Sequence, residues 1–185
     1  MQNQKKIYRL LLAVFMIFIA GFVSVEGAAL GRDQKELYLL FEAIEMNYAP
    51  VFTTLLGQQI DVNGQLFTGT TPLHYAARFG RVAMCQGLIN AGADVNAQNL
   101  CGETPLHEAA SSGSFSCCKL LLQHHALVDL PNNEGKTPLM LAMQRGTSQN
   151  ICDLLTKRGA VLLVRKKCGT TEHAADFSFV YKLTK

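Results

Sequence analysis

The sequence predicts an all-α helical solenoid of about four repeats, with a truncated cap at its C-terminal end and a signal peptide in front. The first observation is a period of 33 residues, because TTPLHYAARFG at 70–80 returns as ETPLHEAASSG at 103–113 and as KTPLMLAMQRG at 136–146. The second is an apolar run after the glycine that closes each copy, so that each unit holds two short helices. Such helices cannot bury their apolar faces alone and must stack on the next copy.

The repeated segment has a physical explanation at most of its positions. A Thr hydroxyl can cap the first helix, and Pro is tolerated at the first helical position because its missing N–H would be unpaired there. Small Ala residues let neighbouring helices approach closely. The closing Gly favours the left-handed backbone at which a helix ends. These positions are Thr71, Pro72, Thr104, Pro105, Thr137 and Pro138 at the helix starts, and Gly80, Gly113 and Gly146 at the ends.

The period also assigns units that lack the repeated segment. Shifting the register back by 33 residues places Leu40 on Leu73 and Asn47 on Gly80 without a gap. At the other end, CGTTEHAADF at 168–177 is a shortened copy without the Pro, and the last ten residues fit a strand or a helix and stay unassigned. The predicted units are a signal peptide (1–29), an N-terminal capping repeat (34–66), two repeats (67–99 and 100–132), a repeat with a one-residue insertion (133–166), and a degenerate C-terminal cap and tail (167–185).

The N-terminal segment has the layout of a secretory signal peptide. Lys5, Lys6 and Arg9 precede an uncharged apolar run at 10–25, and small residues follow it at possible cleavage sites. The alternative is an uncleaved membrane anchor at 10–25, but this run is shorter than the roughly 20 apolar residues that span a bilayer. We therefore expect export to a periplasm or to the exterior, with anchoring as the alternative.

The charge of the chain gives no indication of a nucleic-acid partner. The formal net charge is +3, from 17 Lys and Arg against 14 Asp and Glu, and the N-terminal segment contributes much of it. The remaining chain is nearly neutral, whereas nucleic-acid-binding domains carry a basic patch or stripe.

The repeated segment resembles the ankyrin repeat family, whose period is 33 residues and whose motif is T-P-L-H-x-A. TPLHYA and TPLHEA match the motif, TPLMLA lacks the His, and NAGADVNAQN at 90–99 matches the family's turn into the next hairpin. The resemblance implies an ankyrin-type solenoid over about residues 34–176. It also implies that His74 and His107 join a hydrogen-bond network with the Thr and the adjoining backbone, and that Met140 breaks this network and loosens the hairpin of the fourth unit.

In this family a protein partner generally binds to the hairpin tips and the adjoining first helices. Carried over position by position, the resemblance implies this set: Phe67, Thr68, Thr70, Arg78, Phe79, Leu100, Cys101, Glu103, Ser111, Ser112, Asn133, Glu134, Lys136, Gln144 and Arg145. The scaffold does not require Phe67, Phe79 and Leu100 to be apolar. Together with Arg78 they resemble the aromatic-plus-Arg composition of binding hot spots. The alternative is that the rings fold back over their own hairpins.

The cysteines are expected to remain reduced inside the stack. Cys85, Cys118 and Cys152 occupy one equivalent position on the second helix, and stacked helices lie roughly 8 to 10 Å apart, beyond the roughly 7 Å that a disulfide bridges between Cα atoms. Cys117 is expected to be packed as well. Cys101 and Cys168 instead precede a hairpin Gly at an exposed tip, where they are open to mixed disulfides or tolerated as neutral changes.

No arrangement of residues indicates catalysis, a cofactor or a metal. Paired carboxylates, a nucleophile elbow and a phosphate-binding Gly loop are absent from the sequence. His124 and His125 follow Cys117 and Cys118, but a zinc site requires four convergent ligands. A basic cluster at 165–167, near 157–158, is expected to be a solvated end of the stack and not a contact for a membrane or an acidic partner.

We therefore expect a non-catalytic, exported protein–protein interaction module with an unidentified partner. Two narrower hypotheses remain. One is an adaptor in a bacterial periplasm or outside the cell, for which the resemblance implies support of a partner protein under oxidative stress, and the other is an effector that acts on a host protein. A third, from a different class, is a thiol-redox protein that uses Cys101.

Overall fold

The computed structural model describes residues 32–58, 60–146, 149–164 and 179–181. The chain divides into two compact units, Met1–Glu36 and Leu37–Lys185, and the second unit contains the repeats. The predicted signal peptide at 1–29 lies outside the described residues, as does most of the predicted C-terminal cap. Among the described residues, no helix has the length and apolar character needed to cross a membrane.

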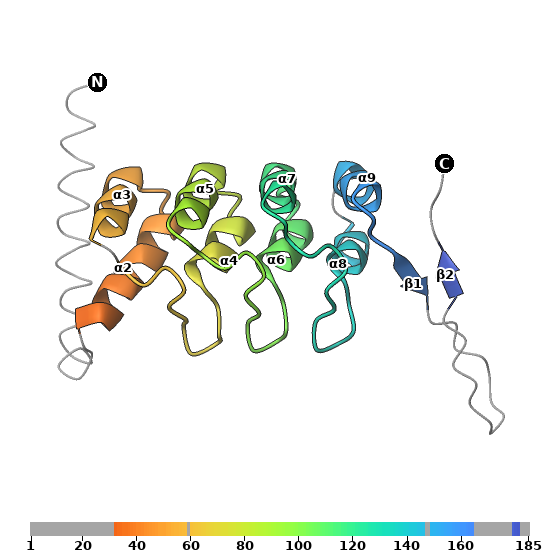
Figure 1. Ribbon diagram of the computed structural model, residues 1–185, viewed down its shortest axis with the longest axis horizontal. Coiled ribbons are helices and arrows are strands. Elements are labelled where there is room, and N and C mark those ends of the chain that lie inside the picture. Colours follow the sequence, from red (N-terminus) through yellow and green to blue (C-terminus); the bar gives the residue numbers. More distant parts are fainter. Residues whose placement is uncertain (1–31, 59, 147–148, 165–178, 182–185) are drawn as a thin grey trace. The chain divides into compact units, whose positions relative to one another are not determined.

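The described residues form eight helices in four consecutive pairs. Figure 1 shows the second helices of the pairs in one row and the first helices in another, and the loops between successive pairs project on the side away from the second helices. The pairs are α2 (Arg32–Glu45) with α3 (Ala49–Gly57), α4 (Pro72–Arg78) with α5 (Val82–Asn90), α6 (Pro105–Ser111) with α7 (Phe115–Gln123), and α8 (Pro138–Gln144) with α9 (Gln149–Lys157).

The first helices begin at the repeated Thr positions and end just before the repeated Gly positions. Thr71 and Thr104 begin α4 and α6 in capping boxes, with Pro in the first helical turn. After α4, Gly80 has a φ of +66°, and in the N-terminal pair Asn47 takes the equivalent place with a φ of +54°. Asn is the residue other than Gly that tolerates this left-handed backbone best, which confirms the alignment of Asn47 with Gly80.

The core is built from layers one period apart. Leu40, Leu73, Leu106 and Leu139 are almost completely buried, one on each first helix. Ala43, Ala76, Ala109 and Ala142 lie three residues later and are also buried, which allows α4 to pack closely on α6 and α6 on α8. The second helices contribute a further buried series of Leu55, Leu88, Leu121 and Leu155.

A polar ladder joins consecutive pairs beyond the ends of the second helices. Asn63 Oδ1 accepts from the backbone N–H of Asp94 at 2.8 Å, and one period later Asn96 Oδ1 accepts from Leu127 N–H at 2.8 Å. In the last step Asp129 takes the place of Asn, and its carboxylate accepts from Val161 N–H at 3.0 Å. Each side chain thereby fixes the start of the segment that leads into the next hairpin.

The all-α fold class predicted from the sequence is incomplete, because the described residues also contain strands. Two short strands, β1 (Leu162–Val164) and β2 (Phe179–Tyr181), pair antiparallel in the register Leu162 with Tyr181, Leu163 with Val180 and Val164 with Phe179. Val164 in the first strand and all three residues of the second, Phe179, Val180 and Tyr181, are β-branched or aromatic, which favours strands. The alternation in the last ten residues therefore forms a strand at 179–181, where the sequence had left strand and helix open.

Candidate protein-binding surface

Three hairpins at 66–70, 99–103 and 132–136 connect the helix pairs of the described chain. Each is closed by two backbone hydrogen bonds. The first runs from Leu66 N–H to Thr70, from Asn99 N–H to Glu103 and from Asn132 N–H to Lys136, and the second returns from the hairpin Gly N–H to the carbonyl of the first residue. In the second and third hairpins an Asn side chain adds support. Asn99 Oδ1 accepts from two backbone N–H groups of its own loop at 2.9 Å each, and Asn132 Oδ1 does the same.

The hairpins also bind one another through the backbone. Leu100 N–H donates to the Thr68 carbonyl at 3.0 Å, and Asn133 N–H donates to the Cys101 carbonyl at 2.9 Å. Gly69 and Gly102 permit this approach. Each has a positive φ, and a Cβ atom at Gly69 would lie 2.8 Å from Leu100 N, whereas one at Gly102 would lie 2.8 Å from Asn133 N. Neighbouring tips therefore form a continuous edge.

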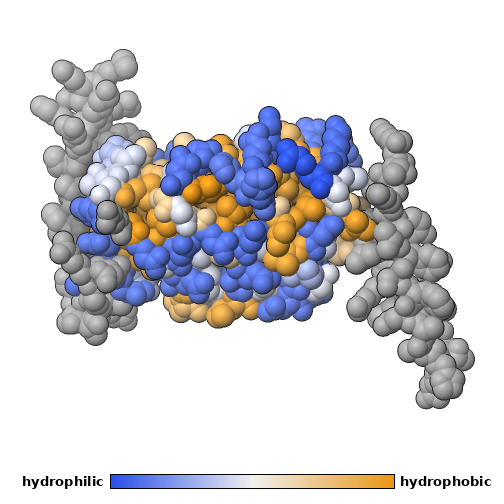
Figure 2. Space-filling model, viewed as in Figure 1, coloured by the Kyte–Doolittle hydropathy of each residue, from blue (hydrophilic) through white to orange (hydrophobic). Residues whose placement is uncertain are grey.

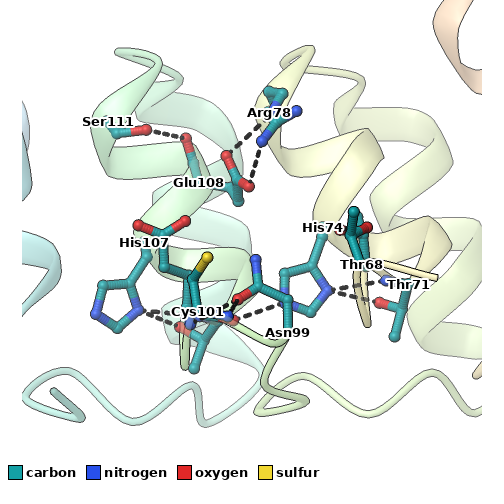
Figure 3. A network of polar contacts seen from close by, with 12 residues as sticks. Thr68, Thr71, His74, Arg78, Asn99, Cys101, His107, Glu108 and Ser111 are labelled. Carbon is teal, nitrogen blue, oxygen red and sulfur yellow. Dashed lines mark hydrogen bonds and ion pairs between the residues drawn. The ribbon is translucent and has the colours of Figure 1, made fainter. Parts of the chain in front are cut away.

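A buried histidine layer lies beneath the tips and links each repeat to the next (Figure 3). His74 Nδ1 accepts from Thr71 N–H at 3.3 Å, and its Nε2 lies 2.9 Å from the carbonyl oxygen of Glu103 in the following hairpin. His107 repeats the arrangement with Thr104 and with the Lys136 carbonyl at 3.1 Å. The resemblance implied contacts with the Thr and the adjoining backbone, whereas the second ring nitrogen reaches the following hairpin.

The contacts fix the tautomer and the charge of both rings. Because Nδ1 accepts a backbone N–H, the proton is on Nε2, which donates to the carbonyl. Both rings are fully buried, and burial lowers the pKa of His74 and of His107 because a charged ring loses its hydration there. The native stack therefore holds neutral imidazoles.

Met140 occupies the third position of this series and lacks the ring. Its backbone N–H still donates to Thr137 Oγ1 at 3.4 Å, so the helix cap survives. The hairpin that a ring at this position would reach lies outside the described residues, and the looser hairpin stays a prediction.

An ion pair that the sequence analysis missed crosses from α4 to α6 (Figure 3). Arg78 Nε donates to Glu108 Oε2 at 2.9 Å, and its Nη2 donates to Oε1 at 2.7 Å. The Glu108 side chain is only 5% exposed, so this carboxylate depends on the guanidinium for its counter-charge. The hydrogen bonds to Glu108 raise the pKa of Arg78. Arg78 is therefore held by the scaffold and is not an unpaired donor for a partner.

Two tip residues of the predicted surface are strongly exposed apolar side chains. Phe67 is 86% exposed and Leu100 is 71% exposed, at equivalent positions of adjacent hairpins. Figure 2 shows apolar residues at the surface along the edge to which the hairpins project. Phe67 and Leu100 thus do not fold back over their own hairpins.

Phe79 behaves differently from these tips. Its ring packs edge-on against Tyr75 with centroids 5.2 Å apart, and Tyr75 packs in the same way against Phe41 at 5.1 Å. With 38% of its surface exposed, Phe79 is the outer end of an aromatic row that continues into the core.

Thr70 was predicted to belong to the partner-binding surface, but only 7% of its surface is exposed. Its hydroxyl lies 2.8 Å from that of Thr68. The equivalent residues Glu103 and Lys136 are partly exposed because their longer side chains extend out of the same backbone position, whereas that of Thr is too short.

The other predicted residues are at least partly exposed, and several are engaged locally. Lys136 Nζ forms an ion pair with Glu134 at 2.7 Å, and Asn133 Nδ2 donates to the Leu100 carbonyl at 2.8 Å. The Ser111 and Ser112 hydroxyls donate to carbonyls of their own helix. Thr68, Cys101, Gln144 and Arg145 are exposed.

The cysteines differ from expectation in two respects. Cys85, Cys117 and Cys118 are fully buried as expected, and burial raises the pKa of Cys118 to about 12. Cys152, however, is only partly buried. Cys85 Sγ also lies 3.9 Å from Cys117 Sγ. Cys at equivalent positions is too far apart to bridge, whereas this close pair is offset by one residue from equivalence. Cys168 lies outside the described residues.

Within the described part of the chain, no group of three or more His, Cys, Asp or Glu side chains is placed to hold a metal ion. The surface consists of loop tips and helix faces over a closed core.

Stacked helix pairs with interlocked protruding hairpins define a helical-repeat solenoid. A family model described as ankyrin repeats (3 copies) matches residues 18–99 and 91–166. The chain therefore belongs to the ankyrin repeat family, whose members are typically protein–protein interaction modules and usually non-catalytic. A search of curated proteins found no match to the chain.

The neutral histidine layer predicts a loss of stability in acid. Because the folded pKa values lie below the unfolded value, the contribution is complete above about pH 6.5 and is lost as the pH falls through that value toward the folded pKa values. His107→Met, which copies the residue at Met140, should lower the free energy of unfolding by about 1–3 kcal/mol at pH 7.5, because the Lys136 carbonyl loses its buried donor. The variant should also lose less stability than the wild type between pH 7.5 and pH 5.

Urea unfolding at each pH measures both effects. His125→Asn is the matched control, because this His is exposed at a positive φ that Asn tolerates. It should keep the pH dependence of the wild type. An unchanged pH dependence in His107→Met would show that the buried ring does not determine acid sensitivity.

Proposed function

We propose that the protein binds a protein partner through the hairpin tips and the exposed faces of α4, α6 and α8. The observation that carries this proposal is the pair Phe67 and Leu100, two large apolar side chains exposed on adjacent tips. Single exposed apolar residues are ordinary, but adjacent ones on a rigid edge favour an interaction site.

The rigidity of this edge supports the proposal. The backbone hydrogen bond from Leu100 N–H to the Thr68 carbonyl fixes the second tip against the first, and the His74 ring fixes the second hairpin from below. A surface ordered before binding loses little conformational entropy when a partner docks.

The residues around the apolar pair indicate the character of the partner. Asn133, Glu134 and Lys136 form a polar continuation on the third hairpin, with Glu134 and Lys136 already neutralising each other. Arg78 is likewise neutralised by Glu108. We therefore propose a partner that presents an apolar patch with a polar border, and not a strongly charged segment.

Replacement of the apolar pair tests this function. Phe67→Ser combined with Leu100→Ser should leave the unfolding transition almost unchanged, since both side chains are exposed, and should weaken partner binding at least tenfold. Leu127→Ser is the matched control, because Leu127 is 52% exposed on the loop after α7 and away from the tips. Quantitative affinity capture from the native host, with all three proteins immobilised at equal density, measures the effect.

The outcome distinguishes specific binding from non-specific adsorption. Species captured by the wild type and by Leu127→Ser, and depleted with the double variant, support the tips as the interface. Equal capture by all three proteins, or equal loss with Leu127→Ser, contradicts the proposal.

We also propose that the mature protein acts outside the cytoplasm, as an adaptor in a periplasm, at the exterior, or as an effector on a host protein. The support is the sequence pattern of 1–29, with basic residues, the apolar run at 10–25 and small residues in order. Intact mass of the protein recovered from fractions of its host tests this. A soluble species that begins near Ala28 or Leu30 supports export, whereas a full-length membrane species indicates an anchor.

The thiol-redox alternative depends on Cys101. This thiol is exposed at the second tip, within the proposed binding surface. Alkylation of the native protein distinguishes the two functions. A redox role requires Cys101 to react faster than a model thiol, whereas a binding role requires only that a bound partner slows its alkylation.

A further inference from the structure

We propose that Cys85 and Cys117 form a disulfide that joins the second and third repeats through their second helices. Cys85 lies on α5 and Cys117 on α7, and these two helices pack against each other. Their sulfur atoms are 3.9 Å apart, and both side chains are fully buried. A disulfide bond of about 2.05 Å requires each sulfur to move about 1 Å, which a rotation of roughly 30° about each Cα–Cβ bond supplies.

The pairing is specific to one interface. Cys85 and Cys117 are offset by 32 positions, one fewer than the repeat period. The same offset relates Phe52 to Met84, and, with the one-residue insertion, Cys118 to Ile151. Of these three equivalent pairs of positions, only the pair on α5 and α7 carries Cys at both.

The local hydrogen bond orients the two sulfurs for this reaction. The Cys85 S–H donates to Cys117 Sγ, which holds the two sulfur atoms next to each other. This bond and burial raise the pKa of the Cys85 thiol, whereas the donated hydrogen bond lowers the pKa of Cys117. Cys117 is accordingly the thiol that ionises first and attacks.

A low-molecular-weight disulfide such as glutathione disulfide is the oxidant. The Cys117 thiolate attacks one sulfur of glutathione disulfide, its S–S bond breaks, and one glutathione leaves and takes up the proton that Cys117 released. The Cys85 thiolate then attacks Cys117 Sγ, the mixed disulfide breaks, and the second glutathione leaves with the second proton. The two protein thiols lose two electrons, and glutathione disulfide gains them.

Burial determines when this reaction can occur. Neither sulfur is accessible in the closed stack, so the oxidant must enter when α5 and α7 separate, during folding or in a local opening. Once formed, the bond closes a loop between residues 32 positions apart. By restricting the unfolded chain it should raise the folding equilibrium constant about 500-fold.

The experiment uses the full chain with Cys101→Ser, which removes the exposed thiol of the second hairpin tip. The chain is equilibrated in excess glutathione disulfide, with a second sample in dithiothreitol, and free thiols are then alkylated. No Lys or Arg lies between Arg81 and Lys119, so trypsin leaves Cys85, Cys117 and Cys118 in one peptide. A Glu-specific protease cleaves after Glu103 and Glu108, and mass spectrometry without reduction then shows whether fragment 82–103 is joined to fragment 109–119.

Two further variants identify the partner of Cys85. The linked fragments should persist with Cys118→Ala and disappear with Cys117→Ala, although both residues are equally buried and adjacent. The oxidised chain should also unfold at a higher urea concentration than the same chain after reduction. This comparison needs no core substitution, so it remains valid if a variant fails to fold.

Three results would overturn the proposal. The first is that both thiols remain fully alkylatable after equilibration in excess glutathione disulfide. The second is that the link survives Cys117→Ala and is lost with Cys118→Ala. The third is that oxidation lowers the urea midpoint, which would mean that the bond strains the stack.

Discussion

The polar contacts that cross from one repeat to the next are the constraint on which this structure depends. His74 and His107 each use one ring nitrogen for the Thr that begins their own helix and the other for a carbonyl of the following hairpin. At the other end of each pair, Asn63, Asn96 and Asp129 fix the start of the next segment. Each repeat is therefore completed by its neighbour, and the 33-residue period is the length that satisfies both ladders.

This constraint separates the residues that the fold requires from those that it leaves free. Thr, Pro, His and Gly recur because caps, buried carbonyls and close backbone approach demand them. Phe67, Leu100 and Asn133 occupy one equivalent tip position, where two are apolar and one is polar, so the scaffold does not determine them. Variation at fixed backbone geometry is how a rigid repeat surface acquires a specific partner.

The period in the sequence predicted most of the stack, because each recurring residue type answers a local requirement. It placed Leu40 at the position equivalent to Leu73 and Asn47 at the position equivalent to Gly80, and the structure has a buried Leu40 and a positive φ at Asn47. The apolar tips Phe67 and Leu100 were also predicted to face outward. These predictions depended on equivalence between repeats, which a sequence displays directly.

The contacts that escaped prediction join positions that are not equivalent. Arg78 meets Glu108 at an offset of 30, and Cys85 meets Cys117 at an offset of 32, so neither pair appears when repeats are aligned. The burial of Thr70 depends on side-chain length at a position where other repeats carry Glu103 and Lys136. Such features follow from the helix packing in three dimensions.

Hydrogen exchange at two hairpin amides tests the dependence on these cross-repeat contacts most directly. Leu100 N–H and Asn133 N–H are bonded only across hairpins, to the carbonyls of Thr68 and Cys101. Because the tips are held by the stack, both amides should exchange as slowly as the core amides of α6, and their rates should rise with urea in parallel with unfolding. Exchange of these two amides near the rate of an unstructured chain, insensitive to urea, would show that the tips open on their own and that the proposed binding edge is not preformed.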